Sequence, residues 1–315
     1  AFFVGVCVDE ALRGKGYGRE LMGTALEELR RRGDAISILQ PRYPDFYRKL
    51  GWGFCYDRQA YRLPLSVASL LLPDPPADLE CTEGGAEHLP FLYEMFTRLR
   101  HGYTLRGRED WDILLKDHRG EGGSIAIARK EGKPCGYVLY NTTHGLLYIR
   151  ELVWLESPVT DALLKYLAVR GKSFGLENME WLDPAGDLVS VLSSVSEPEP
   201  FLMGRIHNLQ AWAAEIEYPA ELAADLEIRI TDPLAAWNDG RFRWSIKDGR
   251  GCMSPSAVTT TPELDMGIDS LSQKYFGYCG AGGPDPAADL IMNESTAAML
   301  EKLFPPCHNY ISEYF

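Results

Sequence analysis

The sequence lacks the cysteine patterns that bind metals or form a disulfide framework. Its seven cysteines include no C-x-x-C pair and do not cluster with the six histidines, so we expect free thiols, no metal site and a cytoplasmic protein. It also lacks a long hydrophobic run. The apolar stretch at the start is too short to span a membrane, and no basic residues precede it as in a signal peptide. We therefore expect no membrane partner.

Positive charge is scarce as well. The 315 residues include 32 Lys and Arg against 45 Asp and Glu, which gives a net charge of −13. This balance disfavours nucleic acid as a partner and attracts cationic molecules, including amines. Hydrophobic residues make up 45% of the chain and aromatic residues 11%, which is enough for a folded protein with two or three cores.

Glycine, in contrast, is concentrated in residues 13–18, which read RGKGYG. Residues 2–8 before this stretch are apolar and partly β-branched, which predicts a buried strand. After it, apolar residues recur at helical spacing as far as Leu29, three arginines follow, and Gly33 ends the predicted helix. Glycines let backbone N–H groups approach an anion, and a helix N-terminus adds partial positive charge. The stretch therefore predicts a cradle for a pyrophosphate.

The glycine spacing distinguishes three kinds of loop. A nucleotide P-loop fails because Lys15 is followed by Gly16 and not by Ser or Thr. A dinucleotide loop needs an acidic residue at the end of the next strand, whereas Asp34 precedes the strand predicted at residues 35–39. What remains is R-x-x-G-x-G after a strand, which resembles the acyl-CoA loop of the GNAT N-acetyltransferase superfamily. The alternative is a glycine-rich turn without a ligand.

This resemblance implies acetyl-CoA as the cosubstrate. The backbone of the strand would hold the pantetheine arm, and the N–H groups of the loop would surround the pyrophosphate. The residues expected to bind the cosubstrate are Val6, Cys7, Val8, Arg13, Gly14, Lys15, Gly16, Tyr17 and Gly18. The side chain of Lys15 meets either a phosphate or only solvent.

A second stretch, residues 43–54, resembles a late helix of the same superfamily followed by a Leu-Gly-aromatic turn. Tyr47 matches the position that in many members protonates the departing CoA thiolate. A phenol with a pKa near 10 can give its proton to a thiolate, because the thiol that forms has a comparable pKa of about 8.5. The alternative is that Tyr47 only packs its ring under the strand. Gln40-Pro41 stands where the family often has Asn, which puts contacts there in doubt.

Three domains are predicted along the chain. Residues 1–70 form the C-terminal part of an acetyl-CoA-binding GNAT domain, because strands and helices that normally precede the cofactor strand are not in the sequence. Residues 77–198 repeat the order helix, helix, hairpin, strand, helix, but Leu155-Glu156-Ser157-Pro158 replaces the glycine cradle, so this second GNAT-like domain should not bind CoA. Residues 199–315 resemble a sterol carrier protein-like α/β domain. The predicted fold class is α+β.

The whole arrangement resembles the Eis-like (enhanced intracellular survival) acetyltransferases. The matching stretches of the last third are residues 203–206, 237–242, 271–273 and 311–315. The resemblance implies direct acetyl transfer to a primary amine of aminoglycoside, polyamine or lysine type, commonly in a hexamer. It also implies that the terminal carboxylate, here on Phe315, is the base. The alternatives are that the aromatic tail only seals the third domain, and that the chain is a non-catalytic lipid-binding or scaffolding protein.

The histidines are weaker candidates for a base. Five of them flank predicted helices or lie in a turn and are expected to be surface or capping residues: His88, His101, His144, His207 and His308. The sixth, His118, is expected in a solvated loop. No Ser/His/Asp arrangement is recognisable.

Overall fold

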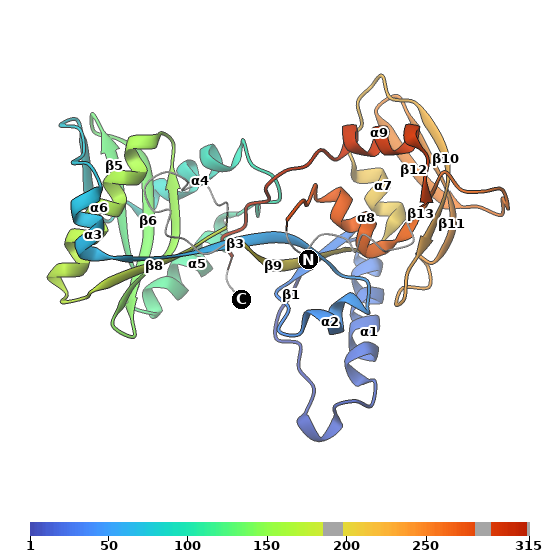
Figure 1. Cartoon of the computed structure of the whole chain (residues 1–315), viewed down its shortest axis with the longest axis horizontal. Helices are drawn as coiled ribbons and strands as arrows, with labels where there is room; N and C mark the ends of the chain where they lie inside the picture. The colour runs from blue at the N-terminus through green and yellow to red at the C-terminus, as the bar shows by residue number, and fades with distance from the viewer. Residues whose placement is uncertain (185–197, 281–290, 314–315) are drawn as a thin grey trace. The chain divides into compact units, whose positions relative to one another are not determined.

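The chain folds into two compact units. The structure, a computed structural model, describes residues 1–184, 198–280 and 291–313 (Figure 1). The first unit contains Ala1–Asp57 and Pro200–His308, and the second contains Arg58–Glu199 and the segment that begins at Asn309. In the described part of the chain, no helix is both long and apolar enough to cross a membrane.

The first unit contains a small sheet in the order β1-β2-β9-β3. β1 (Phe2–Phe3) runs parallel to β2 (Ile36–Leu39), and β9 (Glu199–Ile206) runs antiparallel to β2. The first residues of β3 (Gly53–Pro64) follow β9 in the sheet. The accompanying helices are the 3-10 turn η1 (Glu10–Leu12), α1 (Tyr17–Arg32) and α2 (Pro44–Arg48).

The predicted helix after the glycine stretch is confirmed. It is α1, and it ends at Gly33, whose φ of 87° is the left-handed conformation that favours glycine. Met22 and Leu26 are fully buried on the face of α1 that packs in a core with Leu39 of β2. This packing fixes where the N-terminus of α1 points.

The rest of the first unit is the sterol carrier-like part. Its sheet has the order β12-β11-β10-β13-β14, and the β10–β13 pair is parallel. β10 and β11 form a hairpin, in which Leu226 pairs with Trp244 in an antiparallel ladder. Its elements are α7 (Leu209–Glu215), β10 (Ala224–Thr231), β11 (Gly240–Lys247), β12 (Arg250–Pro255), β13 (Leu264–Gly267), α8 (Ile268–Tyr275), β14 (Ile291–Met292) and α9 (Glu294–Leu303).

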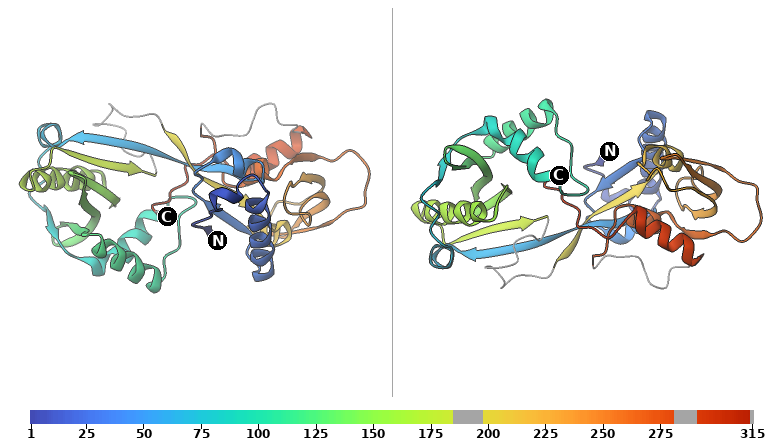
Figure 2. Two further views of the ribbon diagram at one scale, coloured as in Figure 1. Left: turned by 90° about the horizontal axis from the view of Figure 1, so that it is seen from below. Right: turned by 90° about the horizontal axis from the view of Figure 1, so that it is seen from above.

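The second unit has the strand order β3-β8-β7-β6-β5-β4, with β7 and β8 parallel and the other pairs antiparallel. Figure 2 shows β3 and β8 side by side in both views. Its elements are α3 (Leu65–Leu71), β4 (Leu79–Glu83), η2 (Ala86–His88), α4 (Leu89–Thr97), α5 (Arg108–Gly120), β5 (Ser124–Lys130), β6 (Lys133–Thr143), β7 (Leu146–Trp154), α6 (Ser157–Ser173) and β8 (Asn178–Asp183).

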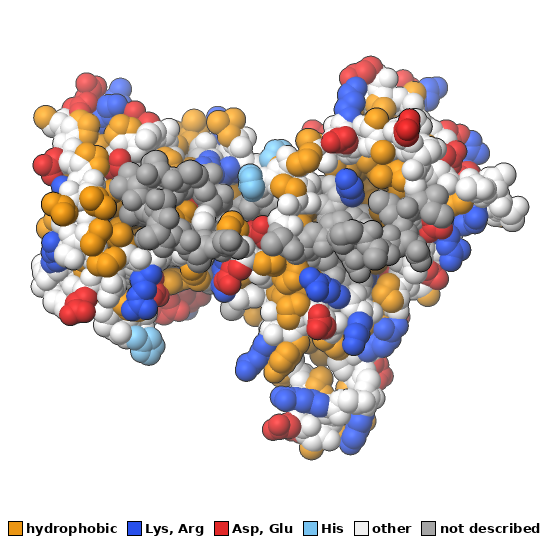
Figure 3. Space-filling model, in the orientation of Figure 1, with side chains coloured by type: hydrophobic (Ala, Val, Ile, Leu, Met, Phe, Trp, Pro, Cys, Tyr) orange, Lys and Arg blue, Asp and Glu red, His pale blue; other side chains and the backbone are white. Residues whose placement is uncertain are grey.

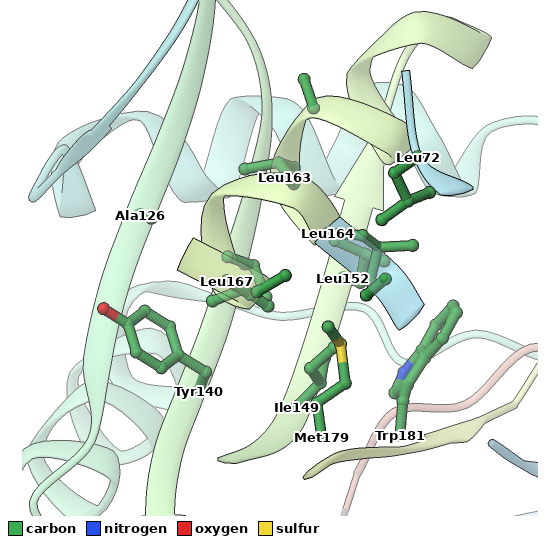
Figure 4. Packing of buried hydrophobic residues seen from close by; sticks show 14 of the residues in the cluster. Leu72, Ala126, Tyr140, Ile149, Leu152, Leu163, Leu164, Leu167, Met179 and Trp181 are labelled. Atoms are coloured by element: carbon green, nitrogen blue, oxygen red, sulfur yellow. The ribbon is translucent and has the colours of Figure 1, made fainter. Parts of the chain in front are cut away.

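Two clusters of buried side chains hold this second unit together. In one, Leu163 and Leu167 of α6 belong to the same cluster as Ile149 of β7 and as Met179 and Trp181 of β8, and Figure 4 labels all five. In the other, side chains of α4 and α5 pack on residues of β5, β6 and β7. The order helix, helix, hairpin, strand, helix predicted from the sequence is therefore confirmed.

Candidate active site

The predicted cradle, residues 13–18, is an exposed turn that leads directly into α1. Gly14 and Gly16 have φ values of 77° and 90°, and a Cβ atom on either would meet nothing within 4 Å. Among the described residues, none accepts a hydrogen bond from the N–H groups of residues 14–19. Free N–H donors at the N-terminus of a 16-residue helix suit an anion. The residues present therefore fit the pyrophosphate of a CoA molecule.

Basic side chains add to this fit. Arg13, Lys15 and Arg19 are exposed, and Figure 3 shows Lys and Arg side chains on the part of the first unit that holds α1. Arg13 donates to the carbonyl oxygen of Val8 at 3.5 Å and lies 3.9 Å from the Glu10 carboxylate. Arg19 donates to the carbonyl oxygen of Pro233, which attaches the first turn of α1 to the sterol carrier-like part.

The strand predicted at residues 2–8 is wrong beyond Phe3. β1 ends there, Val4 is 60% exposed and Cys7 is exposed, while Val6 and Val8 are half-buried. Gly5 explains the break because its φ of 69° leaves the extended region. β1 also lies at the edge of its sheet, so the chain after Phe3 has no neighbouring strand on that side among the described residues.

Tyr47 lies on α2, in the helix predicted to carry it. Its side chain is buried, with 8% of the residue exposed, and the burial raises the pKa of its phenol. The ring makes edge contacts with Phe46 and Trp52, at centroid distances of 5.0 and 6.2 Å. Within the described part of the chain its hydroxyl makes no hydrogen bond, so it is available to a substrate.

The cradle and α2 are in contact. A Cβ atom on Gly18 would lie 3.1 Å from Cζ of Phe46, the residue next to Tyr47. Gly18 therefore has a packing role that the spacing of glycines did not predict. It brings the first turn of α1 close to the helix that carries the candidate acid.

The turn between β7 and α6 in the second unit, which corresponds to the cradle, has a different structure. β7 passes directly into α6, with Glu156 as the capping residue in an extended conformation and Pro158 in the first turn. The Glu156 carboxylate lies 3.0 Å from Nζ of Lys130. The Glu156 side chain makes no capping hydrogen bond to α6, but its negative charge beside the helix N-terminus disfavours an anionic ligand there.

The C-terminal segment, Asn309–Glu313, belongs to the second unit. Tyr310 and Ile311 are each 2% exposed, and the N–H of Tyr310 donates to the carbonyl oxygen of His101 at 2.8 Å. The described part of the tail is thus docked on the second unit, and not on the third domain as the alternative for the tail supposed. Phe315, the predicted base, lies outside the described residues.

Two charged residues that sequence reasoning missed hold this segment. Arg106 and Glu151 form an ion pair of 2.6 Å with side chains about 1% exposed. Arg106 also donates to the Glu313 carboxylate at 2.8 Å and to the Ser312 hydroxyl at 3.0 Å. The Arg106 guanidinium and the Ser312 hydroxyl keep the pKa of Glu151 below its usual value although burial opposes this.

Two histidines are buried, contrary to expectation. His118 is fully buried on α5, where Nε2 lies 2.9 Å from the carbonyl oxygen of Ser124, and is not in a solvated loop. His207 is also fully buried, and burial lowers its pKa to about 4. The local sequence did not reveal the burial of either histidine. The described residues contain no group of three His, Cys, Asp or Glu side chains suited to a metal.

Three family models match the chain. One acetyltransferase (GNAT) domain matches residues 1–55, a second acetyltransferase (GNAT) domain matches residues 102–206, and a sterol carrier protein domain matches residues 209–312. A comparison with curated proteins found no match.

Solved structures with the same fold cover nearly the whole chain. A GCN5-related N-acetyltransferase from Anabaena variabilis is 21% identical, with a TM-score of 0.76 over 97% of this chain and 79% of that one. A GCN5-related N-acetyltransferase from Kribbella flavida is 23% identical, with a TM-score of 0.74 over 100% and 80%. Eis1 from Mycobacterium abscessus is 18% identical, with a TM-score of 0.66 over 98% and 80%. The chain therefore consists of two GNAT acetyltransferase domains followed by a sterol carrier protein domain, with the fold and domain order of the Eis-like acetyltransferases.

Proposed function

We propose that the chain is an acetyl-CoA-dependent N-acetyltransferase that transfers the acetyl group directly to a primary amine. The observation that carries this proposal is the contact of two features in one unit. The cradle offers free N–H donors at the start of α1, and Gly18 packs against the helix that carries Tyr47. The GNAT model matched to residues 1–55 covers both features.

In the proposed binding mode, the N–H groups of Gly14 to Gly18 donate to the pyrophosphate of acetyl-CoA. Arg13 and Lys15 add positive charge at the same turn, which favours a phosphate over solvent as the partner of Lys15. Residues 6–8 are not a strand, but no described residue bonds to their N–H groups. These groups stay available to the pantetheine arm and the thioester carbonyl.

Tyr47 is proposed as the acid. As the amine nitrogen bonds to the thioester carbon, the carbon–sulfur bond breaks, and the Tyr47 hydroxyl gives its proton to the departing sulfur. Burial raises the pKa of this phenol, so the proton stays in place throughout the neutral range. Solvent then restores the proton to Tyr47.

The α-carboxylate of Phe315 is proposed as the base that removes a proton from the ammonium group of the substrate, which gives the neutral amine that attacks. After the carbon–nitrogen bond has formed, the nitrogen loses a second proton to solvent. The reference pKa of an α-carboxyl group, about 3.5, is low for the role of base. Burial of the carboxylate or a relaying water would make it suitable. Burial of Tyr310 and Ile311 in the second unit supports the proposal to the extent that it anchors the segment leading to Phe315.

The acceptor is proposed to be a small amine of aminoglycoside, polyamine or lysine type, because the net charge of −13 attracts cations. A role in lipid binding is less well supported. In the sterol carrier domain, the space between sheet and helices is packed with side chains that include Trp212, Trp244 and Phe304. A hexamer in the cytoplasm remains the expectation from the resemblance, and light scattering would measure the assembly.

Release of free CoA thiol, measured with acetyl-CoA and a panel of amines, tests the function. We expect turnover with at least one polyamine, aminoglycoside or lysine peptide, and an N-acetylated product by mass spectrometry. Hydrolysis of acetyl-CoA without an acetylated amine, or no turnover with any amine, would contradict the proposal.

A further inference from the structure

Resting on the proposed function, we infer that Arg205 is a positioning residue for Tyr47. Arg205 lies on β9, more than 150 positions later in the chain, and has no direct contact with the candidate active site. It is nevertheless bound to the turn that ends α2. Through this arginine, the sterol carrier domain takes part in placing the catalytic hydroxyl.

Arg205 is held by a pair of hydrogen bonds from one side. Its Nη2 donates to both carboxylate oxygens of Asp232 at 2.7 Å, and both side chains are 0% exposed. Asp232 is itself fixed by its own loop, because it accepts from the N–H groups of Leu234 and Ala235 at 2.9 and 2.8 Å. The guanidinium is therefore a rigid point within the first unit.

The other side of the guanidinium faces the turn after α2. Nη1 donates to the carbonyl oxygen of Leu50, and the guanidinium carbon lies 4.9 Å from the centre of the Trp52 ring. Gly51 between them has a φ of 87°, and a Cβ atom there would lie 2.0 Å from Nη1. Glycine is thus required for both the turn and the approach of Arg205.

The same turn holds Tyr47. The carbonyl oxygen of Tyr47 accepts from the N–H groups of Leu50 and Trp52 at 2.9 and 3.1 Å. The ring of Trp52 meets the ring of Tyr47 edge-on. Because Arg205 fixes the Leu50 carbonyl and one face of Trp52, it fixes both the backbone and the ring that locate the Tyr47 side chain.

Lysine at this position would keep the charge but not the geometry. An ammonium group has no planar fork, so it cannot hold Asp232, Leu50 and the Trp52 face together. We expect Arg205→Lys to lower kcat about tenfold while KM for acetyl-CoA stays within twofold, since a displaced acid matters mainly as the thiolate leaves.

Asp232→Asn should also lower kcat, and it replaces Arg205→Lys as the test variant if Arg205→Lys does not fold. The matched control is Arg243→Lys, because Arg243 and Asp225 form an exposed bidentate pair in the same domain.

Non-additivity distinguishes positioning from general damage. In a Tyr47→Phe background there is no hydroxyl left to place, so Arg205→Lys should lower kcat no further. An equal fold loss in both backgrounds would overturn the inference.

A readout that needs no activity separates this inference from the proposed function. With 3-fluorotyrosine placed at residue 47 alone, the fluorine resonance should shift or broaden in Arg205→Lys and Asp232→Asn but not in Arg243→Lys. An unchanged resonance in both variants would overturn the positioning role even if the chain is an acetyltransferase. A changed resonance in a chain without turnover would support positioning and count against the proposed function.

Discussion

The two GNAT domains of this chain differ most where a strand passes into the helix that follows it. Before α1 the turn contains glycines with positive φ and leaves its N–H groups free, whereas before α6 it contains Glu156 and Pro158. The second domain holds the chain's own C-terminal segment through Arg106 and Glu151. The two domains therefore differ both in the turn before this helix and in what the rest of the domain holds, because Arg106 and Glu151 lie away from the turn before α6.

The largest effect on activity is expected from a change at the C-terminus of the chain. Adding two glycines after Phe315 keeps every side chain but moves the terminal carboxylate. We expect amine acetylation to be abolished, with acetyl-CoA affinity and thermal stability close to those of the parent. The same two glycines added before Ala1 are the control. An extended protein that acetylates at the parental rate would show that the base lies elsewhere.

The next effect concerns Tyr47, the proposed acid of the first domain. Tyr47→Phe should lower kcat by roughly ten- to a thousandfold and leave KM for acetyl-CoA nearly unchanged, since the hydroxyl matters as the sulfur leaves. Steady-state kinetics measures this. Tyr140→Phe in the second domain, whose hydroxyl donates to Glu83, is the matched control. Normal turnover of the Tyr47 variant would reduce this residue to packing.

Gly16→Val tests the cradle itself. A β-branched residue is strained at a φ of 90°, and its side chain would occupy the open space that a pyrophosphate needs. We expect acetyl-CoA affinity to fall about a hundredfold, or about 3 kcal/mol. Calorimetry measures it, with Ser157→Val at the start of α6 as the control. Unchanged affinity in Gly16→Val would remove the cradle assignment.

The two buried histidines allow a comparison by pH. The pKa of His207 is about 4 in the folded state, below its unfolded value of about 6.5. Its neutral form is favoured by folding, so its stabilisation is complete above about pH 6.5 and is lost as the pH falls towards 4. Between pH 7 and 5 we expect a loss of about 2 kcal/mol of unfolding free energy.

Denaturant melts at the two pH values measure this loss. His207→Phe should lose less stability over that interval, whereas an exposed residue such as His144 should give no change when replaced by Asn. His118 is expected to act in the same direction, because burial also lowers its pKa. An equal pH dependence of parent and His207→Phe would contradict this account.

The smallest expected difference is in the number of CoA molecules that each chain binds, one as against two. Because the turn before α6 has no glycines and carries the negative charge of Glu156, titration should give one CoA per chain. A value near two would mean that the two junctions are equivalent after all.

Local sequence was sufficient for most elements and for the core of the candidate site. The glycine stretch, α1 and the helix with Tyr47 follow from short patterns, because turn geometry and helix periodicity depend on neighbouring residues. Arg205 and Arg106 could not be found in this way. Their partners Asp232 and Glu151 are distant in sequence, and a buried ion pair is defined only by the packed fold. The strand predicted beyond Phe3 failed at Gly5, where one backbone angle outweighed an apolar pattern.

The place of β9 in the first sheet has a consequence for how the protein is made. β9 is paired with β2, so that Ile36 lies opposite Ile206, and it separates β2 from β3. During synthesis, the strands of the first domain emerge long before the strand that joins them, and the whole second domain is translated in between. Pairings so far apart in sequence form late because a long loop must close first. We expect the sheet of the second unit to fold first on the ribosome, although its C-terminal segment is added last, and the first domain to be complete only after β9 has emerged.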